Sequence, residues 1–322
     1  MIVTLQAAER ALPELERIEG IEVITRYELA QARDAATLAE GLADAWATIA
    51  GGEPYARELF EAVPQLEAVL RWGTGSDAID LAAATAAGVA VVTTPAVNAE
   101  AVADMALALM LACLRRLPDL DRAVRSGAWK LDGPTRDLAC ATVGVVGLGA
   151  IGRAVTRRLR AFGCRVLAHE PNPDQDFCAE HEVELTDLEG MLPRIDVLTL
   201  HAPATAASRG MIGAAELNRL PNHAVLINTA RGDLIDYPAL VRALETGQIA
   251  GAGLDVFAHE PVAGDDPILS APNAILSGHV SSYTEVGLER TKEALLANVR
   301  AVAGGRLPAS CLNPEAWDRD QT

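Results

Sequence analysis

The chain has 322 residues, half of them hydrophobic, and a net charge of −17 from 44 acidic and 27 basic side chains. This length allows two domains of ordinary size, each with its own apolar core. The negative charge argues against nucleic acid or an anionic membrane surface as the main partner, because both would repel the chain.

The five cysteines are scattered, and no two of them form a C-x-x-C pair. We therefore expect neither a disulfide framework nor a metal site. The start of the chain lacks the basic stretch and long apolar run of a signal peptide. The most apolar segment, residues 99–117, contains two acids and ends near two arginines, which favours a buried helix over a membrane span. A cytoplasmic protein with reduced thiols is expected.

Short apolar runs alternate with helical patterns over residues 1–97. The runs that predict strands are residues 2–5, 21–24, 45–49, 68–72 and 89–92. The segments that predict helices or helical turns between them are residues 7–19, 28–42, 55–62 and 77–87. Strands separated by helices pair in parallel, so we expect a first α/β domain here.

A long helix over residues 98–117 is expected to link this domain to a second one, with Asn98 as its N-cap. Its apolar face is predicted at Val102, Met105, Leu109 and Ala112. Residues 122–140 predict an irregular connection that crosses to the next domain.

The second domain is also α/β in pattern. The runs that predict its later strands are residues 195–200, 224–228, 251–256 and 274–276. A helix is predicted at residues 240–246, and another at 284–303 is expected to return the chain to the first domain. We therefore predict a nucleotide-binding domain, residues 98–287, inserted between the two parts of a substrate domain, residues 1–97 and 288–322.

The stretch 142–170 begins this second domain and carries a G-x-G-x-x-G motif at Gly147, Gly149 and Gly152. An apolar strand precedes the motif, and a helix and a second strand follow it, which is the context that a dinucleotide-binding site requires. The glycines allow a tight turn, close approach of a pyrophosphate and close packing of helix on strand. The helix start at Ala150 and Ile151 presents unpaired N–H groups to the phosphates.

Glu170 ends the second strand of this stretch, where a carboxylate can accept hydrogen bonds from the adenosine ribose hydroxyls. An acid at this position would repel a 2′-phosphate, so we expect NAD(H) as the cofactor and not NADP(H). Arg165 lies on the strand that precedes Glu170, and His169 could weaken the preference for NAD(H) over NADP(H).

Polar residues follow three later strands, where the ligand crevice of an open parallel sheet lies. Arg231 follows the run at 224–228, Asp255 and Glu260 follow the run at 251–254, and His279 follows the run at 274–276. Reduction of a 2-keto acid needs such groups. Histidine is the usual proton donor near neutral pH, and a carboxylate beside it favours its charged form.

We therefore expect His279 as the acid/base, Glu260 as its partner and Arg231 as the group that holds the substrate and stabilises developing negative charge. Each of the three could instead be an ordinary surface, turn or cap residue, but their shared placement at strand ends favours a site. His259 is a second candidate for the acid/base. In an extended segment it would alternate away from Glu260.

With these residues in place, the sequence resembles the D-isomer-specific 2-hydroxyacid dehydrogenase family from about residue 50 onward. The motifs that carry the resemblance are RWGTGSDAIDL (71–81), VGVVGLGAIG (143–152), LHAP (200–203), LINTARGDLID (226–236), GAGLDVFAHEP (251–261) and SGHVSSYTE (277–285). The resemblance implies two Rossmann-like parallel-sheet domains, the substrate domain being flavodoxin-like, with a small-molecule site in the cleft and a homodimer.

The resemblance also implies individual roles. The catalytic set would be Arg231, Glu260 and His279. Asp255 and the backbone of Thr229, Ala230 and Arg231 would meet the nicotinamide, and the segment His201, Ala202 and Pro203 would line the adenine side. Backbone N–H groups of Thr74 and Gly75 would hold the substrate carboxylate, and glycines around this loop allow close approach. Trp72 and Tyr283 are candidate pocket walls.

The chain departs from the family pattern at Gly278, where proline is usual before the histidine, and at Ser282, a tryptophan in some members. Two other functions are therefore considered. One is an NAD(H)-binding corepressor of the same fold, whose loop resembles Tyr283 and the two residues after it slightly. The other is a phosphite dehydrogenase, which Trp72 disfavours because that branch has lysine there.

Overall fold

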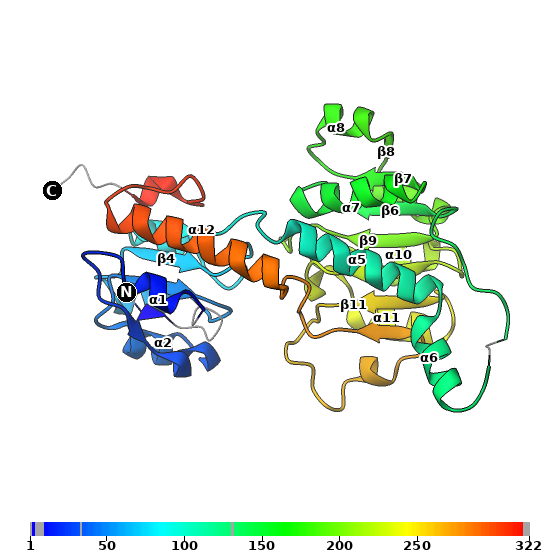
Figure 1. The fold of residues 1–322 in the computed structure, drawn as a ribbon, viewed down its shortest axis with the longest axis horizontal. Helices are drawn as coiled ribbons and strands as arrows, with labels where there is room; N and C mark the ends of the chain where they lie inside the picture. The colour runs from blue at the N-terminus through cyan, green and yellow to red at the C-terminus, as the bar shows by residue number, and fades with distance from the viewer. Residues whose placement is uncertain (1, 4–9, 33, 130–131, 318–322) are drawn as a thin grey trace. The chain divides into compact units, whose positions relative to one another are not determined.

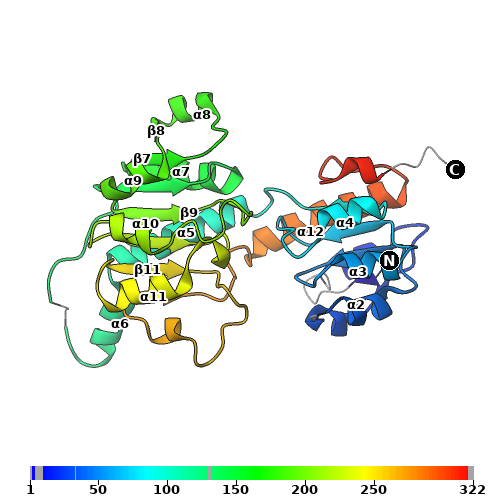
Figure 2. The same ribbon diagram turned by 180° about the vertical axis from the view of Figure 1, so that it is seen from behind.

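A computed structural model describes residues 2–3, 10–32, 34–129 and 132–317 of the chain. The chain divides into two compact units. The first combines Met1–Asn98 with Thr284–Thr322, and the second is Ala99–Tyr283 (Figures 1 and 2).

The first unit contains a parallel sheet that has five strands in the described residues, in the order β2-β1-β3-β4-β5. This is the flavodoxin-like order of a doubly wound sheet. Its strands are β1 (Ile2–Val3), β2 (Ile24–Thr25), β3 (Ala47–Ala50), β4 (Ala68–Arg71) and β5 (Ala90–Val92). Its helices are α1 (Leu12–Leu15), α2 (Ala35–Leu42), α3 (Arg57–Ala62), α4 (Leu81–Ala86) and α12 (Glu285–Ala303), with short 3₁₀ turns η2 (Tyr27–Gln31) and η6 (Pro314–Ala316).

Alternate residues of these strands enter two separate cores. Val69 packs with side chains of α2, α3 and α4 on one face. Leu70, the next residue, packs with Leu295 and Val299 of α12 on the other face. Both faces are therefore covered, which is why the strands are apolar runs without a polar side.

The second unit contains a parallel sheet that has seven strands in the described residues, in the order β12-β11-β10-β9-β6-β7-β8. Its strands are β6 (Thr142–Val146), β7 (Arg165–His169), β8 (Val183–Leu185), β9 (Val197–Leu200), β10 (Val225–Asn228), β11 (Gly251–Leu254) and β12 (Ala274–Leu276). The order reverses between β6 and β9, and such a switch point is where doubly wound sheets bind ligands.

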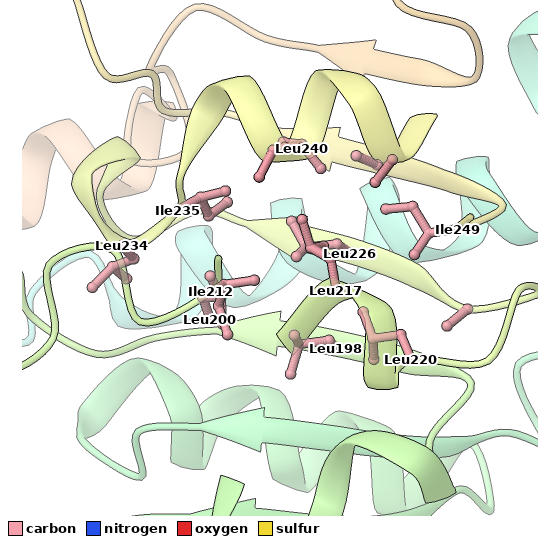
Figure 3. Close-up of a cluster of buried hydrophobic side chains, with 14 of the residues drawn as sticks. Leu198, Leu200, Ile212, Leu217, Leu220, Leu226, Leu234, Ile235, Leu240 and Ile249 are labelled. Carbon is pink, nitrogen blue, oxygen red and sulfur yellow. The ribbon is translucent and has the colours of Figure 1, made fainter. Parts of the chain in front are cut away.

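Helices cover both faces of this sheet. They are α5 (Ala99–Leu114), α6 (Leu117–Arg125), α7 (Ala150–Ala161), α8 (Gln175–Glu180), α9 (Leu188–Met191), α10 (Ala214–Arg219) and α11 (Tyr237–Glu245), with 3₁₀ turns η3 (Leu192–Arg194), η4 (Gly232–Leu234) and η5 (Pro267–Ser270). Figure 1 shows α5 and α7 on the near face, and Figure 2 shows α10 and α11 on the other. Figure 3 shows Leu240 of α11 and Leu217 of α10 against Leu226 of β10, where all three are fully buried.

Two α/β units with parallel sheets confirm the fold class expected from the sequence. The predicted strands are present, with ends shifted by a few residues. Two parts of the prediction lie outside the described residues: residues 4–5 of the first predicted strand and residues 7–9 of the first predicted helix. The structure also has β8, α8, α9 and α10, which were not predicted from the sequence.

The single helix expected over residues 98–117 is wrong at its end. Helix α5 stops at Leu114, and Arg116 adopts a left-handed backbone conformation with φ of 49°. A second helix, α6, then starts at Leu117 with proline in its first turn and runs to Arg125, through the start of the segment expected to be irregular. Because a left-handed residue cannot continue a right-handed helix, the chain turns at Arg116. No helix in the described part of the chain is long and apolar enough to cross a bilayer.

Candidate active site

The glycine motif forms the turn between β6 and α7. Gly147 has a φ of +91°, and a Cβ there would come within 2.8 Å of the His201 carbonyl oxygen. A Cβ at Gly152 would lie 1.9 Å from the Gly147 carbonyl oxygen, so the helix packs directly on the turn. Only glycine fits at these two positions, and the turn is held against the segment that follows β9.

The start of α7 is arranged to accept an anion. Gly149 is its N-cap and supplies no side-chain capping bond. Among the hydrogen bonds of the described chain, none uses the N–H groups of Gly149, Ala150 or Ile151. A Cβ built at Gly149 would meet no atom within 4 Å, so the space in front of this backbone is open. Free N–H groups and an open approach fit the pyrophosphate of a dinucleotide.

Glu170 lies beside the same turn, directly after β7. One carboxylate oxygen accepts the Leu148 N–H at 2.8 Å, and the other accepts the Asn172 N–H at 3.0 Å. The acid is therefore fixed next to the glycine motif. Arg165, at the opposite end of β7, pairs with Glu184 at 2.6 Å.

The loop after β10 is braced by a buried side chain. The Asn228 carboxamide accepts the Ala230 N–H at 3.0 Å and donates to the Arg231 carbonyl at 2.8 Å. The next residue, Gly232, lies against the loop after β11, since a Cβ at 232 would fall 2.0 Å from the Phe257 carbonyl carbon. The Arg231 loop and the loop that carries Glu260 are thus in direct backbone contact.

Glu260 and His279 form a close pair at the same edge of the sheet. The Nδ1 atom of His279 lies 2.6 Å from Oε2 of Glu260, and the Phe257 N–H donates to the other glutamate oxygen at 3.0 Å. Burial alone would raise the pKa of Glu260, but the bonds from His279 and the Phe257 N–H outweigh it and hold this pKa below its usual range. The carboxylate is therefore ionised beside the imidazole at neutral pH.

His259, the second candidate for the acid/base, is exposed, and no hydrogen bond of the described chain involves its side chain. The structure therefore brings Glu260 together with His279 and not with its neighbour in sequence.

Asp255 is fully buried and holds the loop that carries His279. Its carboxylate accepts hydrogen bonds from the Ser277 hydroxyl at 2.7 Å, the Val280 N–H at 3.0 Å, the Ser281 N–H at 3.0 Å and the Ser281 hydroxyl. Burial opposes the charge, but these bonds prevail and hold the pKa of Asp255 below its usual range. The Asp255 carbonyl also accepts the His279 N–H at 2.7 Å.

This clamp fixes a backbone conformation that histidine rarely adopts. His279 has a φ of +54°, in the left-handed region, which costs a non-glycine residue of order 1–2 kcal/mol. The contacts of Asp255 supply several hydrogen bonds to the same five-residue loop, so they keep the imidazole directed toward Glu260.

Two polar atoms at the ends of β9 and β10 are buried without a partner in the described chain, namely Nδ1 of His201 and Oγ1 of Thr229. Burial lowers the pKa of His201 to about 3, so the ring is neutral at physiological pH. Its Nε2 lies 2.9 Å from the Thr199 hydroxyl. Orphaned buried polar atoms are uncommon, and here they fit a bound group that supplies the missing hydrogen bonds. Ala202 is partly buried beside them, and Pro203 is exposed.

In the first unit, side chains of Arg71 and Thr74 hold the loop after β4 in place through hydrogen bonds to backbone carbonyl groups. The Arg71 side chain donates to the carbonyl oxygens of Trp72 at 2.6 Å and Gly75 at 2.9 Å, and the Thr74 hydroxyl donates to the Thr94 carbonyl at 3.1 Å. No hydrogen bond among the described residues uses the N–H groups of Thr74 or Gly75. These two donors fit a carboxylate, whereas the Trp72 ring packs partly against the α12 side of the core.

Several residues that build the site were missed in the sequence. Asn228, Gly232, Ser277, Ser281 and Arg71 act on neighbours of the reacting groups, and none has a charge or spacing that marks it. The runs AVLIN (224–228) and AILSG (274–278) did indicate that polar residues follow these two strands. They did not indicate which of the polar residues hold a loop in place. Tyr283, expected at the pocket wall, ends the second unit and is 62% exposed.

Residues 107–281 match the family described as D-isomer specific 2-hydroxyacid dehydrogenase, NAD binding domain. The chain is 40% identical to the glyoxylate reductase of Korarchaeum cryptofilum over 82% of this chain and 81% of that protein.

Two solved structures share the fold. The D-lactate dehydrogenase of Aquifex aeolicus, solved with NAD and lactic acid, has a TM-score of 0.88 and 27% identity over 97% of this chain and 98% of that one. The NADPH-dependent glyoxylate/hydroxypyruvate reductase of Sinorhizobium meliloti, solved with NADP and malonate, has a TM-score of 0.85 and 34% identity over 98% and 96%. The chain therefore belongs to the D-isomer specific 2-hydroxyacid dehydrogenase family and is an NAD-dependent dehydrogenase of 2-hydroxy acids.

Proposed function

We propose that the protein interconverts a small 2-keto acid of the glyoxylate or hydroxypyruvate type and its D-2-hydroxy acid, with His279 as the acid/base. The observation that carries this proposal is the 2.6 Å contact between His279 Nδ1 and the ionised Glu260, at the sheet edge that also carries Arg231. The glyoxylate reductase relative, 40% identical to this chain, supports the substrate class.

The nicotinamide of bound NADH supplies the hydride that the carbonyl carbon of the keto acid receives. Glu260 fixes the imidazole through Nδ1, which leaves Nε2 to donate a proton to the carbonyl oxygen. The Arg231 guanidinium stabilises the negative charge that this oxygen gains. In the oxidative direction Nε2 takes the hydroxyl proton back, so atoms and charges balance in both directions.

We propose two supporting roles. The free N–H groups of Thr74 and Gly75 bind the substrate carboxylate, as their open donors suggest. Asp255 positions His279 through the loop 277–281. A carboxylate has about four acceptor positions, and Ser277, Val280 and Ser281 use them.

The test is a panel of keto acids assayed side by side with NADH and NADPH. Glyoxylate, hydroxypyruvate, pyruvate, phenylpyruvate and phosphohydroxypyruvate should include at least one good substrate with NADH. Phosphite with NAD⁺ is the control for the phosphite dehydrogenase alternative. Tight NADH binding with no turnover of any keto acid would contradict the proposal and favour the corepressor alternative.

We also propose a homodimer formed through α6. This nine-residue helix has no buried side chain, and its apolar stripe at Leu117, Leu120 and Val124 has helical spacing. Leu117 and Val124 are 59% and 52% exposed, and Trp129, just beyond the helix, is 87% exposed. A second copy of the chain would cover this stripe with its own, as in a two-fold interface.

Sedimentation velocity at micromolar concentration should show a dimer for the wild type and a monomer for Leu117→Glu/Val124→Glu. The control is Phe162→Glu, which changes an exposed residue at the far end of α7 and should leave the dimer intact. A monomeric wild type would show that the α6 stripe is not a dimer interface.

A further inference from the structure

The end of β7 carries more charge than the dinucleotide motif requires. Glu170, Asp174 and Asp176 all lie in the segment that follows this strand. Arg153, one residue after the last glycine of the motif, faces the same segment from α7.

Arg153 is held by two contacts and an aromatic face. Its Nε donates to the Leu148 carbonyl at 2.9 Å, and its Nη1 pairs with Asp174 at 2.8 Å. The guanidinium carbon lies 5.3 Å from the centre of the Phe177 ring. Leu148 is also the residue whose N–H binds Glu170. The guanidinium and the ribose-side acid therefore flank the same residue of the glycine turn.

Asp174 has a second task that keeps it in place. Its other oxygen caps α8 by accepting the Phe177 N–H at 3.1 Å. This capping bond, with the Arg153 charge, holds the pKa of Asp174 below its usual range. The carboxylate thus stays ionised and paired with Arg153, in a contact whose two side chains are partly exposed.

The other arginines of α7 and β7 in the described chain are engaged elsewhere. Arg157 and Arg158 pair with Glu100 and Asp104, Arg160 pairs with Glu182, and Arg165 pairs with Glu184. Among these residues only Arg153 contacts the glycine turn. A 2′-phosphate at the end of β7 would therefore have Arg153 as its cationic partner, if Arg153 were released.

We propose that Arg153 is a latent 2′-phosphate-binding group and that Asp174 withholds it, so that Asp174 and Glu170 together set the preference for NAD over NADP. This inference rests on the NAD site at the glycine turn. Glu170 would repel the phosphate directly, and Asp174 would remove the cation that could attract it. The NADPH dependence of the Sinorhizobium meliloti relative shows that the shared fold leaves this choice to side chains.

The test measures binding of ADP and of 2′,5′-ADP by calorimetry, without turnover. The variants are Glu170→Gln and Asp174→Asn, singly and together. Asparagine caps helices as well as aspartate, so Asp174→Asn keeps the α8 cap and removes the ion pair. The ratio of the two dissociation constants cancels any general loss of the site, and it does not depend on the reaction proposed above.

We expect the double variant to improve 2′,5′-ADP binding relative to ADP by at least about tenfold over the wild type, since a charge-assisted contact to phosphate forms. Adding Arg153→Gln should return the ratio to within about twofold of Glu170→Gln alone, and adding Arg165→Gln in its place should change nothing. The proposal is overturned if the gain survives Arg153→Gln, or if Asp174→Asn adds nothing to Glu170→Gln.

Discussion

A methyl group on Gly232 would lie 2.0 Å from the carbonyl carbon of Phe257 and 2.1 Å from its oxygen. Backbone atoms cannot yield as a flexible side chain can, so glycine is required at this position. Phe257 in turn donates its N–H to Glu260, whose other oxygen holds His279. The absence of a side chain at Gly232 thus allows the close approach of the Arg231 loop to the loop that carries Glu260.

Gly232→Ala is expected to force the two loops apart. We expect a loss of about 2–4 kcal/mol in the free energy of unfolding, because overpacking against backbone has no rotamer to relieve it. Keto-acid turnover should fall as well, since Arg231 and His279 lose their spacing. Thermal melts and steady-state rates measure both. Gly264→Ala is the control. Gly264 follows Glu260 in the chain, and a Cβ there would meet no atom within 4 Å, so this variant should match the wild type.

His279→Gln is expected to lose about 10²- to 10⁴-fold in kcat, the usual contribution of general acid–base catalysis. NADH binding, followed by fluorescence, should remain near that of the wild type, because the glycine turn is unchanged. The neighbouring exposed histidine provides the control, and His259→Gln should be fully active. If the two variants behave the other way round, the proton is carried by His259 and our assignment is wrong.

Glu260→Gln is expected to change the pH dependence of keto-acid reduction. Glu260 is ionised well into the acid range, because contacts with His279 and the Phe257 N–H hold its pKa below its usual value against the opposing effect of burial. As pH falls through this lowered pKa, the wild type loses the charged acceptor that fixes His279, so its kcat/KM should fall on the acid side, whereas the glutamine variant should lack this acid limb. Asp265→Asn, an exposed residue in the same loop, should leave the profile unchanged.

Asp255→Asn is expected to destabilise the second unit by about 2–4 kcal/mol at pH 7, since an amide would set an N–H against the donors of Ser277, Val280 and Ser281. The native pKa of Asp255 is depressed, so its contribution to stability is present above the unfolded-state pKa and lost as pH falls through the native pKa. The difference in Tm between wild type and variant should therefore shrink below about pH 4.

Calorimetric melts at several pH values measure this difference, with Asp176→Asn, an exposed acid, as the control. The same Asp255→Asn protein should lose turnover while its affinity for ADP stays unchanged, because the clamp acts on the loop of His279 and not on the glycine turn. A variant with the melting temperature and kcat of the wild type would show that the four hydrogen bonds do not position His279.

Most of the fold could be predicted from local pattern. Apolar runs of three to six residues separated by helical segments predict parallel strands covered on both faces, and the structure has them. The break between α5 and α6 was missed although Pro118 marks it, because a proline near a helix end does not show whether the chain turns there; the left-handed residue Arg116 makes the turn. Helix α8 also escaped notice, although Asp174 is a good N-cap.

Local patterns in the chain were sufficient to show which residues follow the strands: the glycine turn with Glu170, and Arg231, Glu260 and His279 after three later strands. Parallel pairing brings strand ends to one edge, so chain order is enough to gather them. The partners of these residues come from tertiary contacts. Asp255 holds a loop more than twenty residues further on, Asp174 neutralises Arg153, and Gly232 sets the distance between two loops. Each depends on a contact between segments distant in sequence, which no local pattern encodes.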